Sequence, residues 1–222
     1  MINKKYITHK REIFFEIAKK YISKDSRVLD IGAGNASFSR ICEREDFYLY
    51  EGNPSTYNSL KSKYKNVVLG HLPKLSFEDN FFDVIHCSHV VEHLETEVFY
   101  QTLVEMDRCL KNNGKLIISA PLFWKGFYDD LSHIRPYPPA IFKNYLCAQE
   151  NDQRTRPIIS TDYEMVEEVF RYKEIDFFEN IYNNKVGIIL KVIIKMYRKI
   201  MNLGLKKLVK TGYTVVLVKR KG

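Results

Sequence analysis

The sequence of 222 residues predicts an α/β fold in which a mostly parallel sheet lies between two layers of helices. Two observations support this prediction. Short apolar runs alternate with helical patterns up to Pro121, which is typical of parallel strands joined by crossover helices. The first apolar run, Arg27–Ile31, ends in Gly32-Ala33-Gly34, as expected for a buried strand that enters a tight loop.

The first half of the chain predicts five strands and four helices. Pro54 follows Asn53 and takes the favoured first position of a helix, and Asn112-Asn113-Gly114 predicts a turn before the fifth strand. The expected strands are 27–31, 47–51, 67–69, 82–87 and 115–120. The expected helices are 7–22, 36–45, a segment from Pro54 and 96–110.

Beyond Pro121 the pattern changes. Residues 121–160 are rich in Pro, Tyr and Asp and lack periodicity, which predicts an inserted and partly helical cap after the fifth strand. Thr161–Arg171 is predicted to be a helix because Thr161 and Glu164 suit a capping box. Tyr172–Phe178 and Tyr213–Lys219 complete a sheet of seven strands, of which the last is antiparallel, within one domain spanning 1–222.

Charge is unevenly distributed along the chain. The formal net charge is +8, yet the segment from Lys185 to Gly222 holds no acidic residue. Within it, 186–210 predicts an amphipathic helix with Lys191, Lys195 and Arg198 on one basic face, and these charges interrupt any run that could span a bilayer. The helix has three interpretations: contact with an anionic membrane surface, an interface of a homodimer, or packing on its own domain.

The four cysteines stand apart and form no Cys-x-x-Cys pair, which favours reduced thiols over a zinc knuckle or a disulfide framework. The N-terminal residues carry charges with no apolar run behind them, so no signal peptide is predicted. We therefore expect a cytoplasmic protein, with 186–210 as the candidate for peripheral contact at the inner face of the membrane.

The glycine turn indicates a nucleotide site. Glycines let the backbone turn sharply and approach a ligand closely, and Asp30 stands at the carboxyl end of the strand, where open α/β sheets bind ligands. Glu51 ends the next strand and is placed to accept hydrogen bonds from ribose hydroxyls. The third glycine of a nicotinamide-binding turn and the Gly-Lys-Ser/Thr of a phosphate-binding loop are both absent from the sequence.

With these motifs the sequence resembles class I S-adenosylmethionine-dependent methyltransferases, in the broad group that includes ubiquinone, menaquinone and sugar methyltransferases. Val28–Gly34 is similar to the first motif of the family and Glu51 to the second. Further similar segments are Pro73–Ile85, His89–Leu94 and Leu110–Leu116. The resemblance implies a Rossmann-like fold and S-adenosyl-L-methionine as the cofactor.

The resemblance also implies the residues that bind the cofactor: Asp30, Gly32, Gly34, Glu51, Gly52, His71, Leu72, Ser88 and His93. One position departs from the family. Relatives commonly carry an acidic residue after the third strand to bind the adenine amino group, whereas this chain has His71 there. Backbone groups near His71 and Leu72 are expected to bind the adenine instead.

The predicted cap supplies the candidate catalytic residues. His133-Ile134-Arg135-Pro136-Tyr137 resembles an H-x-R-x-Y segment that follows the fifth strand in many relatives. We expect His133 to act as a base or to orient the acceptor, Arg135 to hold an anionic group of the substrate, and Tyr137 to complete the site. The alternative is that His133 and Arg135 only attach the cap to the core.

A metal site is the other interpretation of the histidines. The run His89-x-x-Glu92-His93, with the later His133, is similar to the metal-binding run of small-RNA 3′-terminal 2′-O-methyltransferases, but starts with histidine. Glu-His-Leu is also widespread in metal-free relatives, where it lines the cofactor pocket. We therefore expect no metal.

The expected reaction is O-methylation of a small molecule or a saccharide, as in polysaccharide biosynthesis. A lipid-quinone or other small-molecule methyltransferase is the nearest alternative, and a non-catalytic partner subunit with a cofactor fold is the alternative of a different class. Nucleic acid is not favoured as a partner, because the sequence shows no aromatic stacking module or basic recognition helix on the side of the active site.

Overall fold

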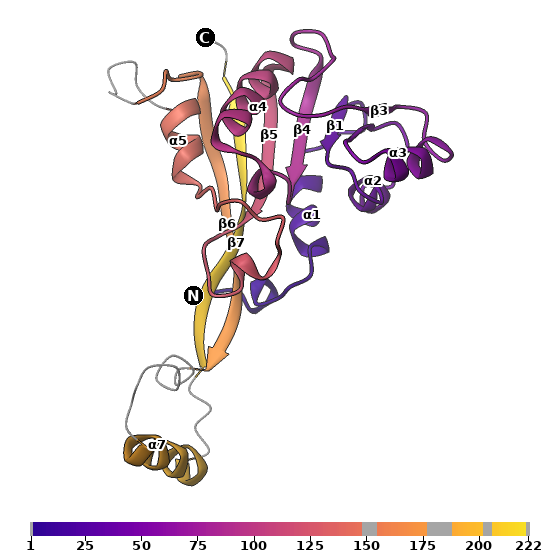
Figure 1. Ribbon diagram of the computed structural model, residues 1–222. Coiled ribbons are helices and arrows are strands. Elements are labelled where there is room, and N and C mark those ends of the chain that lie inside the picture. The colour runs from indigo at the N-terminus through magenta and orange to yellow at the C-terminus, as the bar shows by residue number, and fades with distance from the viewer. Residues whose placement is uncertain (1, 148–154, 177–187, 202–205, 221–222) are drawn as a thin grey trace.

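The computed structural model describes residues 2–147, 155–176, 188–201 and 206–220, and its centre is one sheet in the order β3-β2-β1-β4-β5-β7-β6 (Figure 1). The strands are β1 Val28–Ile31, β2 Tyr48–Glu51, β3 Val67–Leu69, β4 Phe82–Ser88, β5 Leu110–Pro121, β6 Tyr163–Asp176 and β7 Lys206–Lys219. Strands β1 to β5 are parallel, and β7 pairs antiparallel with both β5 and β6. The predicted seven-stranded sheet with an antiparallel last strand is therefore confirmed.

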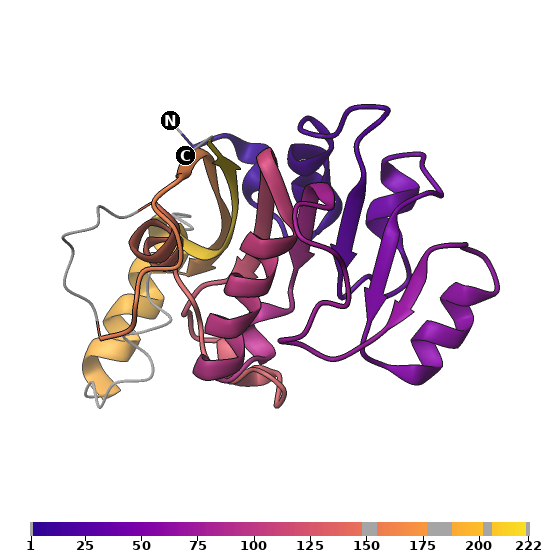
Figure 2. The same cartoon turned by 90° about the horizontal axis from the view of Figure 1, so that it is seen from above.

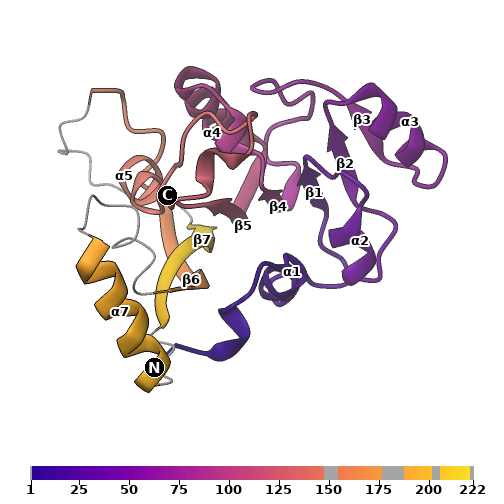
Figure 3. The same ribbon diagram turned by 60° about the horizontal axis from the view of Figure 1, so that its bottom comes forward.

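Helices cover both faces of the sheet, as predicted (Figures 2 and 3). The helices of the sheet layers are α1 Glu12–Lys19, α2 Ser37–Ile41, α3 Pro54–Lys61, α4 Thr96–Cys109 and α5 Ala140–Leu146, and a further helix, α7, spans Ile188–Met201. The 3₁₀ turns are η1 Lys4–Tyr6, η2 Val91–His93 and η3 Phe127–Asp129. Alternate residues of β1 divide the core: Val28 packs with Ile17 of α1 in one apolar cluster, while Leu29 packs with Leu103 of α4 in the other.

The start of α3 follows the sequence signal. The side chain of Asn53 accepts hydrogen bonds from the backbone N–H groups of Ser55 and Thr56, at 2.9 and 3.2 Å, and Pro54 occupies the first turn. Such a cap satisfies backbone donors that the helix itself leaves unpaired. The cap also fixes the path of the chain directly after Glu51, which ends β2.

The predicted helix at Thr161–Arg171 is wrong. These residues begin β6, and Tyr163 to Arg171 pair antiparallel with Lys219 to Gly212 of β7. Tyr163, Met165, Val169 and Phe170 suit a strand, but a register shift between Met165 and Glu167 breaks the alternation that would have indicated one. Pairing with β7 thus overrides the local capping signal of Thr161 and Glu164.

The predicted cap contains η3 and α5, so it is partly helical, while 148–154 lie outside the described residues. Its backbone is attached to η2, because Ile134 and Arg135 both donate to the carbonyl oxygen of Glu92, at 2.8 and 3.4 Å. All four cysteines are free thiols, as expected.

The predicted basic helix is present as α7, while its flanking residues 186–187 and 202–205 lie outside the described part of the chain. Figure 1 shows α7 beyond the end of the long β6–β7 ribbon, apart from the sheet. Leu190, Ile193 and Met196 of α7 are 49%, 55% and 58% exposed. Among the residues that the structure describes, no helix is long and apolar enough to cross a membrane.

Candidate functional site

The glycine turn after β1 has the geometry that only glycine adopts easily. Gly32 and Gly34 have φ values of +69° and +55°. A Cβ atom on Gly32 would lie 2.3 Å from Cγ2 of Val90, so a side chain there would displace the loop after β4. Ile31 pairs with Tyr50 of β2 and Cys87 of β4, which brings the carboxyl ends of three parallel strands to this turn. Open α/β sheets bind ligands at this edge.

Glu51 closes the turn from the end of β2. Its Oε2 accepts a hydrogen bond from the backbone N–H of Gly34 at 3.0 Å, and its Oε1 accepts one from the N–H of Asn53 at 2.9 Å. Each carboxylate oxygen has a further lone pair to offer. The half-buried carboxylate is therefore held in position and can still accept two hydroxyl donors, which fits the ribose of a nucleoside.

Asp30 is placed differently from the other predicted ligands of the cofactor. Its carboxylate is buried, and Oδ1 lies 2.7 Å from Nδ1 of His86 on β4. The ring of Phe38 from α2 lies against His86, with the centroids 3.8 Å apart. Asp30 therefore contacts the buried ring of His86, and this contact joins the end of β1 to β4. Local sequence patterns do not indicate His86, because its contact with Asp30 depends on the pairing of β1 with β4.

A cavity of about 1080 Å³ opens beside the turn. Its lining includes Asp30, Gly32, Gly34 and Ser88 of the predicted cofactor site, together with residues 9–12 of the N-terminal segment. Glu51, Gly52, His71, Leu72 and His93 are not part of this lining. The predicted cofactor residues thus follow the edge of the sheet and extend beyond this one cavity.

The predicted adenine side lies at the ends of β2 and β3. Gly70 donates its N–H to the carbonyl oxygen of Glu51 at 3.1 Å, which places His71 and Leu72 next to the Glu51 loop. A Cβ atom on Gly52 would lie 3.4 Å from Nδ1 of His71, so the imidazole packs against that glycine. His71 is exposed and Leu72 half-buried. His71 and Leu72 therefore lie next to the Glu51 loop, and neither carries an acidic side chain.

Past β4, a hydrogen-bonded chain that the sequence analysis missed runs from Ser88 to Arg171. Ser88 Oγ lies 3.0 Å from Nδ1 of His89, and Nη1 of Arg171 donates to Nε2 of His89 at 3.3 Å. Burial, followed by the charges of Arg11 and Arg171, holds the pKa of His89 well below its usual value. A Cβ atom on Gly212 would lie 2.8 Å from Nη2 of Arg171, so Gly212 leaves room for the guanidinium. No local motif connects β4 with β6, so sequence patterns could not indicate these hydrogen bonds between Ser88, His89 and Arg171.

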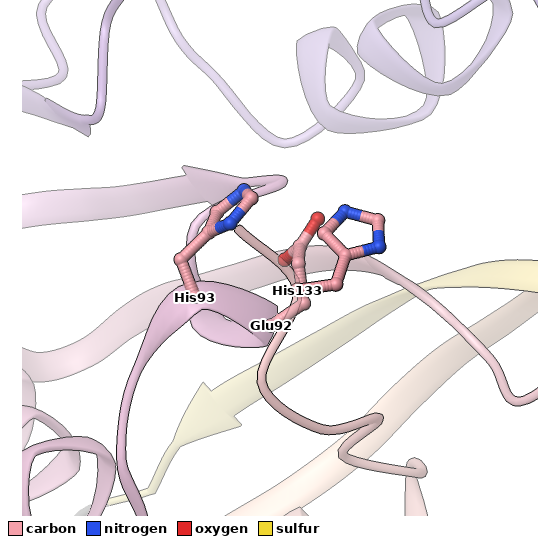
Figure 4. A group of neighbouring side chains, drawn as sticks. All are labelled: Glu92, His93 and His133. Atoms are coloured by element: carbon pink, nitrogen blue, oxygen red, sulfur yellow. The ribbon is translucent and has the colours of Figure 1, made fainter. Parts of the chain in front are cut away.

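The predicted site residues His93 and His133 converge with Glu92, which the sequence offered only under the metal interpretation. Figure 4 shows the carboxylate of Glu92 between the rings of His93 and His133. One ligand atom from each residue lies within 4.8 Å of the other two. Nδ1 of His93 donates to the carbonyl of Ser132 at 3.0 Å, and Nδ1 of His133 donates to that of Phe127 at 2.6 Å. These bonds leave Nε2 of each neutral imidazole as an acceptor.

The carboxyl group of Glu92 is 1% exposed, and among the described residues neither of its oxygens has a hydrogen-bond partner. Burial raises its pKa to about 7, although the charges of Arg11 and Arg171 act in the opposite direction. A buried polar group without a partner is costly and rare, and its presence in a site is a reason to look for a ligand.

The predicted role of Tyr137 in the site stays a prediction, although its surroundings are those of a core residue. Tyr137 is 2% exposed, its hydroxyl donates to the carbonyl of Leu94 at 2.9 Å, and its ring packs on Phe99. It belongs to the core because the cap folds back on α4. Arg135 is exposed and donates to Oγ1 of Thr96 at 3.0 Å, the attachment that the alternative interpretation expects.

Comparison with known families agrees with this geometry. Residues 29–118, less than half of the chain, match a family model described as "Methyltransferase domain". An uncharacterised protein of Methanocaldococcus jannaschii is 32% identical over 114 residues, 48% of this chain and 48% of that protein. The match thus spans about half the length of this curated relative.

Comparison with solved structures gives the same fold. A SAM-dependent methyltransferase from Archaeoglobus fulgidus aligns with a TM-score of 0.61 and 22% identity, over 97% of each chain. The YcgJ protein from Bacillus subtilis aligns with a TM-score of 0.60 and 18% identity, over 96% of this chain and 100% of that one. At these identities the similarity concerns the fold.

Proposed function

We propose that the chain is a class I, S-adenosylmethionine-dependent methyltransferase that methylates an oxygen atom of a small molecule or a saccharide. The match of residues 29–118 to a methyltransferase-domain model supports this proposal. The observation that carries the proposal is the turn of Gly32 and Gly34, closed by Glu51. The turn lets the backbone approach a nucleoside, and the fixed carboxylate accepts from ribose hydroxyls.

S-adenosylmethionine, when bound, supplies a methyl group on a sulfonium, so the intrinsic reactivity of the transfer belongs to the cofactor. The chain has to place the acceptor in line and exclude water. We assign Glu51 to the ribose, backbone groups near His71 and Leu72 to the adenine, and Ser88 and His93 to the other end of the cofactor.

An alcohol acceptor also needs a group that takes its proton while the O–CH₃ bond forms and the S–CH₃ bond breaks. Nε2 of His133 suits this role, because its Nδ1 already donates to Phe127 and fixes the tautomer that accepts at Nε2. An anionic group on the acceptor would be held by Arg171, which is more buried than Arg135 and is hydrogen-bonded to His89 beyond the end of β4.

Binding of S-adenosylhomocysteine, measured by isothermal titration calorimetry, tests the cofactor site. We expect Glu51→Gln to weaken binding by about 10- to 100-fold, since hydrogen bonds to a charged group contribute about 1.5–3 kcal/mol. Glu45→Gln, an exposed glutamate outside the site, is the matched control and should bind as the wild type does. Equal affinity in the Glu51 and Glu45 variants would contradict the assignment.

A second experiment follows the acceptor. The protein is incubated with S-adenosylmethionine labelled in its methyl group and with two panels, saccharides with free hydroxyls and reduced quinones. Label in the saccharides supports the proposal, and label in the quinones supports the nearest alternative. No transfer to either panel, with S-adenosylhomocysteine binding intact, would favour the non-catalytic partner subunit. Unchanged turnover in His133→Ala would remove His133 from the mechanism.

A further inference from the structure

We propose that Glu92, His93 and His133 form a binding site for a divalent transition-metal ion. Each residue offers one ligand atom, and these atoms lie within 4.8 Å of one another. An ion at the usual ligand distance of about 2.1 Å would draw them roughly 1 Å closer. One carboxylate and two imidazoles are a ligand set that zinc, manganese and iron take in proteins, with open positions for water or a substrate.

The hydrogen bonds around the two histidines are those of a metal site. Metal-bound histidines nearly always donate their other ring N–H to a carbonyl or carboxylate, which orients the ring. His93 donates to the carbonyl of Ser132 and His133 to that of Phe127. Both rings are therefore held by the backbone with Nε2 available.

Glu92 provides the independent observation. Its carboxylate is 1% exposed, and within the described part of the chain no donor reaches either oxygen. Arg11 and Arg171 lie close enough to act on its charge, yet neither donates to it. A bound cation would satisfy both oxygens at once. Asp130, whose Oδ2 lies 4.0 Å from Nε2 of His133, stands at the exposed side of the cluster.

The site lies near the proposed chemistry. Cys87 of β4 is paired with Ile31, so Glu92 and His93 follow closely after the strand that ends beside the glycine turn. An ion there would hold an acceptor oxygen and lower the pKa of its hydroxyl, so that solvent water could take the proton in place of His133, whose Nε2 would bind the ion. This role rests on the proposed function, whereas metal binding itself does not.

The test measures metal binding directly. The purified full chain is treated with a chelator, dialysed and titrated with Zn²⁺ and with Mn²⁺ by calorimetry. We expect one ion per chain, and binding at least about 100-fold weaker in Glu92→Gln and in His133→Ala, the upper end of what loss of an outer-shell partner costs. Glu45→Gln, at an exposed glutamate outside the cluster and the cavity, is the matched control for Glu92→Gln and should bind as the wild type does.

Absence of stoichiometric binding, or equal affinity in Glu92→Gln and wild type, would overturn the metal site. Because Glu92 has no partner to lose, Glu92→Gln is expected to fold, and its thermal unfolding checks this. Metal binding with no methyl transfer to any acceptor would contradict the proposed function while leaving the metal site in place. If the wild type bound no metal and His133→Ala lost turnover, the metal site would be overturned and His133 would keep its proposed role as the base.

A different observation carries a second proposal: α7 binds the surface of an anionic lipid bilayer. Leu190, Ile193 and Met196 recur at steps of three along α7 and are each about half exposed. Lys191 and Lys195 lie between them in sequence, and no acidic residue occurs from Lys185 to Gly222. An apolar stripe beside basic residues matches the acyl boundary and the negative head groups of such a bilayer.

Co-sedimentation with phosphatidylcholine vesicles, with and without phosphatidylglycerol, tests this surface. We expect binding to the anionic vesicles, and a loss of at least about tenfold in Ile193→Glu/Met196→Glu, because each buried apolar side chain contributes about 1.5–3 kcal/mol. Leu131→Glu, at a fully exposed leucine outside α7, is the matched control. Equal binding of the wild type to both vesicle types would overturn the proposal. Equal binding of the wild type and the double variant to the anionic vesicles would also overturn it. A dimer in light scattering that the double variant abolishes would assign the stripe to a second copy instead.

Discussion

The parallel strands β1 to β4 and the antiparallel ribbon of β6 and β7 belong to one sheet but use their residues differently. The parallel strands are short, and functional residues such as Glu51 and Ser88 stand at their carboxyl ends. The ribbon strands have 14 residues each, and side chains on them join the sheet to the cap and to the residues after α1, as Tyr213 does with Tyr137 and Glu167 with Tyr21. We therefore expect cofactor binding and stability to be separable along the chain.

The largest effect is expected at the glycine turn. Gly32→Ala adds a Cβ atom 2.3 Å from Val90 at a positive φ. Left-handed strain of about 1–2 kcal/mol and overpacking of about 1–3 kcal/mol together predict a loss of S-adenosylhomocysteine affinity of roughly 100-fold in calorimetry. In the double variant Gly32→Ala/Val90→Ala, we expect recovery of only that part of the affinity which overpacking against Val90 had cost. If Gly32→Ala bound S-adenosylhomocysteine with the wild-type affinity, the proposal that this turn binds the cofactor would be contradicted.

In the ribbon, Tyr213→Phe should affect stability and leave binding unchanged. The buried hydroxyl of Tyr213 donates to the carbonyl of Tyr137 at 2.5 Å, and its removal leaves that carbonyl unpaired. We expect the free energy of unfolding in denaturant to fall by about 1–3 kcal/mol. The affinity for S-adenosylhomocysteine should stay at the wild-type value, and a parallel loss of affinity would show that the two regions are coupled.

Asp83 on β4 tests whether the parallel strands also depend on charge for stability. Burial raises the pKa of Asp83, but hydrogen bonds from Lys111 and from the backbone N–H of Arg27 outweigh it and hold the pKa below the ordinary 3.8. The stabilisation is therefore full above pH 3.8 and is lost as the pH falls through the lower folded value. Asp83→Asn should cost about 1 kcal/mol at pH 7, after allowance for partial exposure. The measurement is urea unfolding of both proteins at several pH values. A difference in the free energy of unfolding between wild type and Asp83→Asn that does not become smaller below pH 3.8 would contradict this.

The smallest effect is expected at the outer edge of the ribbon. Arg220 pairs with Glu164, but both side chains are more than half exposed. Such pairs contribute about 0–1 kcal/mol, so Arg220→Ala should change the midpoint of thermal unfolding very little. A shift as large as that of Tyr213→Phe would mean that the exposed edge, rather than the buried hydroxyl, fixes the ribbon.

The sequence predicted the parallel strands and the turn because both signals are local: a buried strand is an apolar run, and a turn at positive φ needs glycine. Sequence patterns did not predict the structure where contacts between distant segments determine it. Thr161–Arg171 is a strand because β7 pairs with it, and Tyr137 is in the core because the cap folds onto α4.

The same reason limited the prediction of the site. Glu92 and His93 are neighbours in sequence, but the approach of His133 and the lack of any donor to Glu92 depend on the path of the cap. The sequence analysis named all of these residues and expected no metal, because Glu-His-Leu alone carries no information on hydrogen-bond partners.

The position of β7 between β5 and β6 also constrains the order in which the sheet can assemble. β6 precedes β7 in the chain but touches the rest of the sheet through it, so β6 has no place to dock until β7 has paired with β5. That pairing joins residues about a hundred positions apart, such as Ile118 and Val215, and closing so long a loop is slow. The edge from β3 to β5 can therefore form first, and the arrival of β7 is expected to be the late step that brings Arg171 to His89.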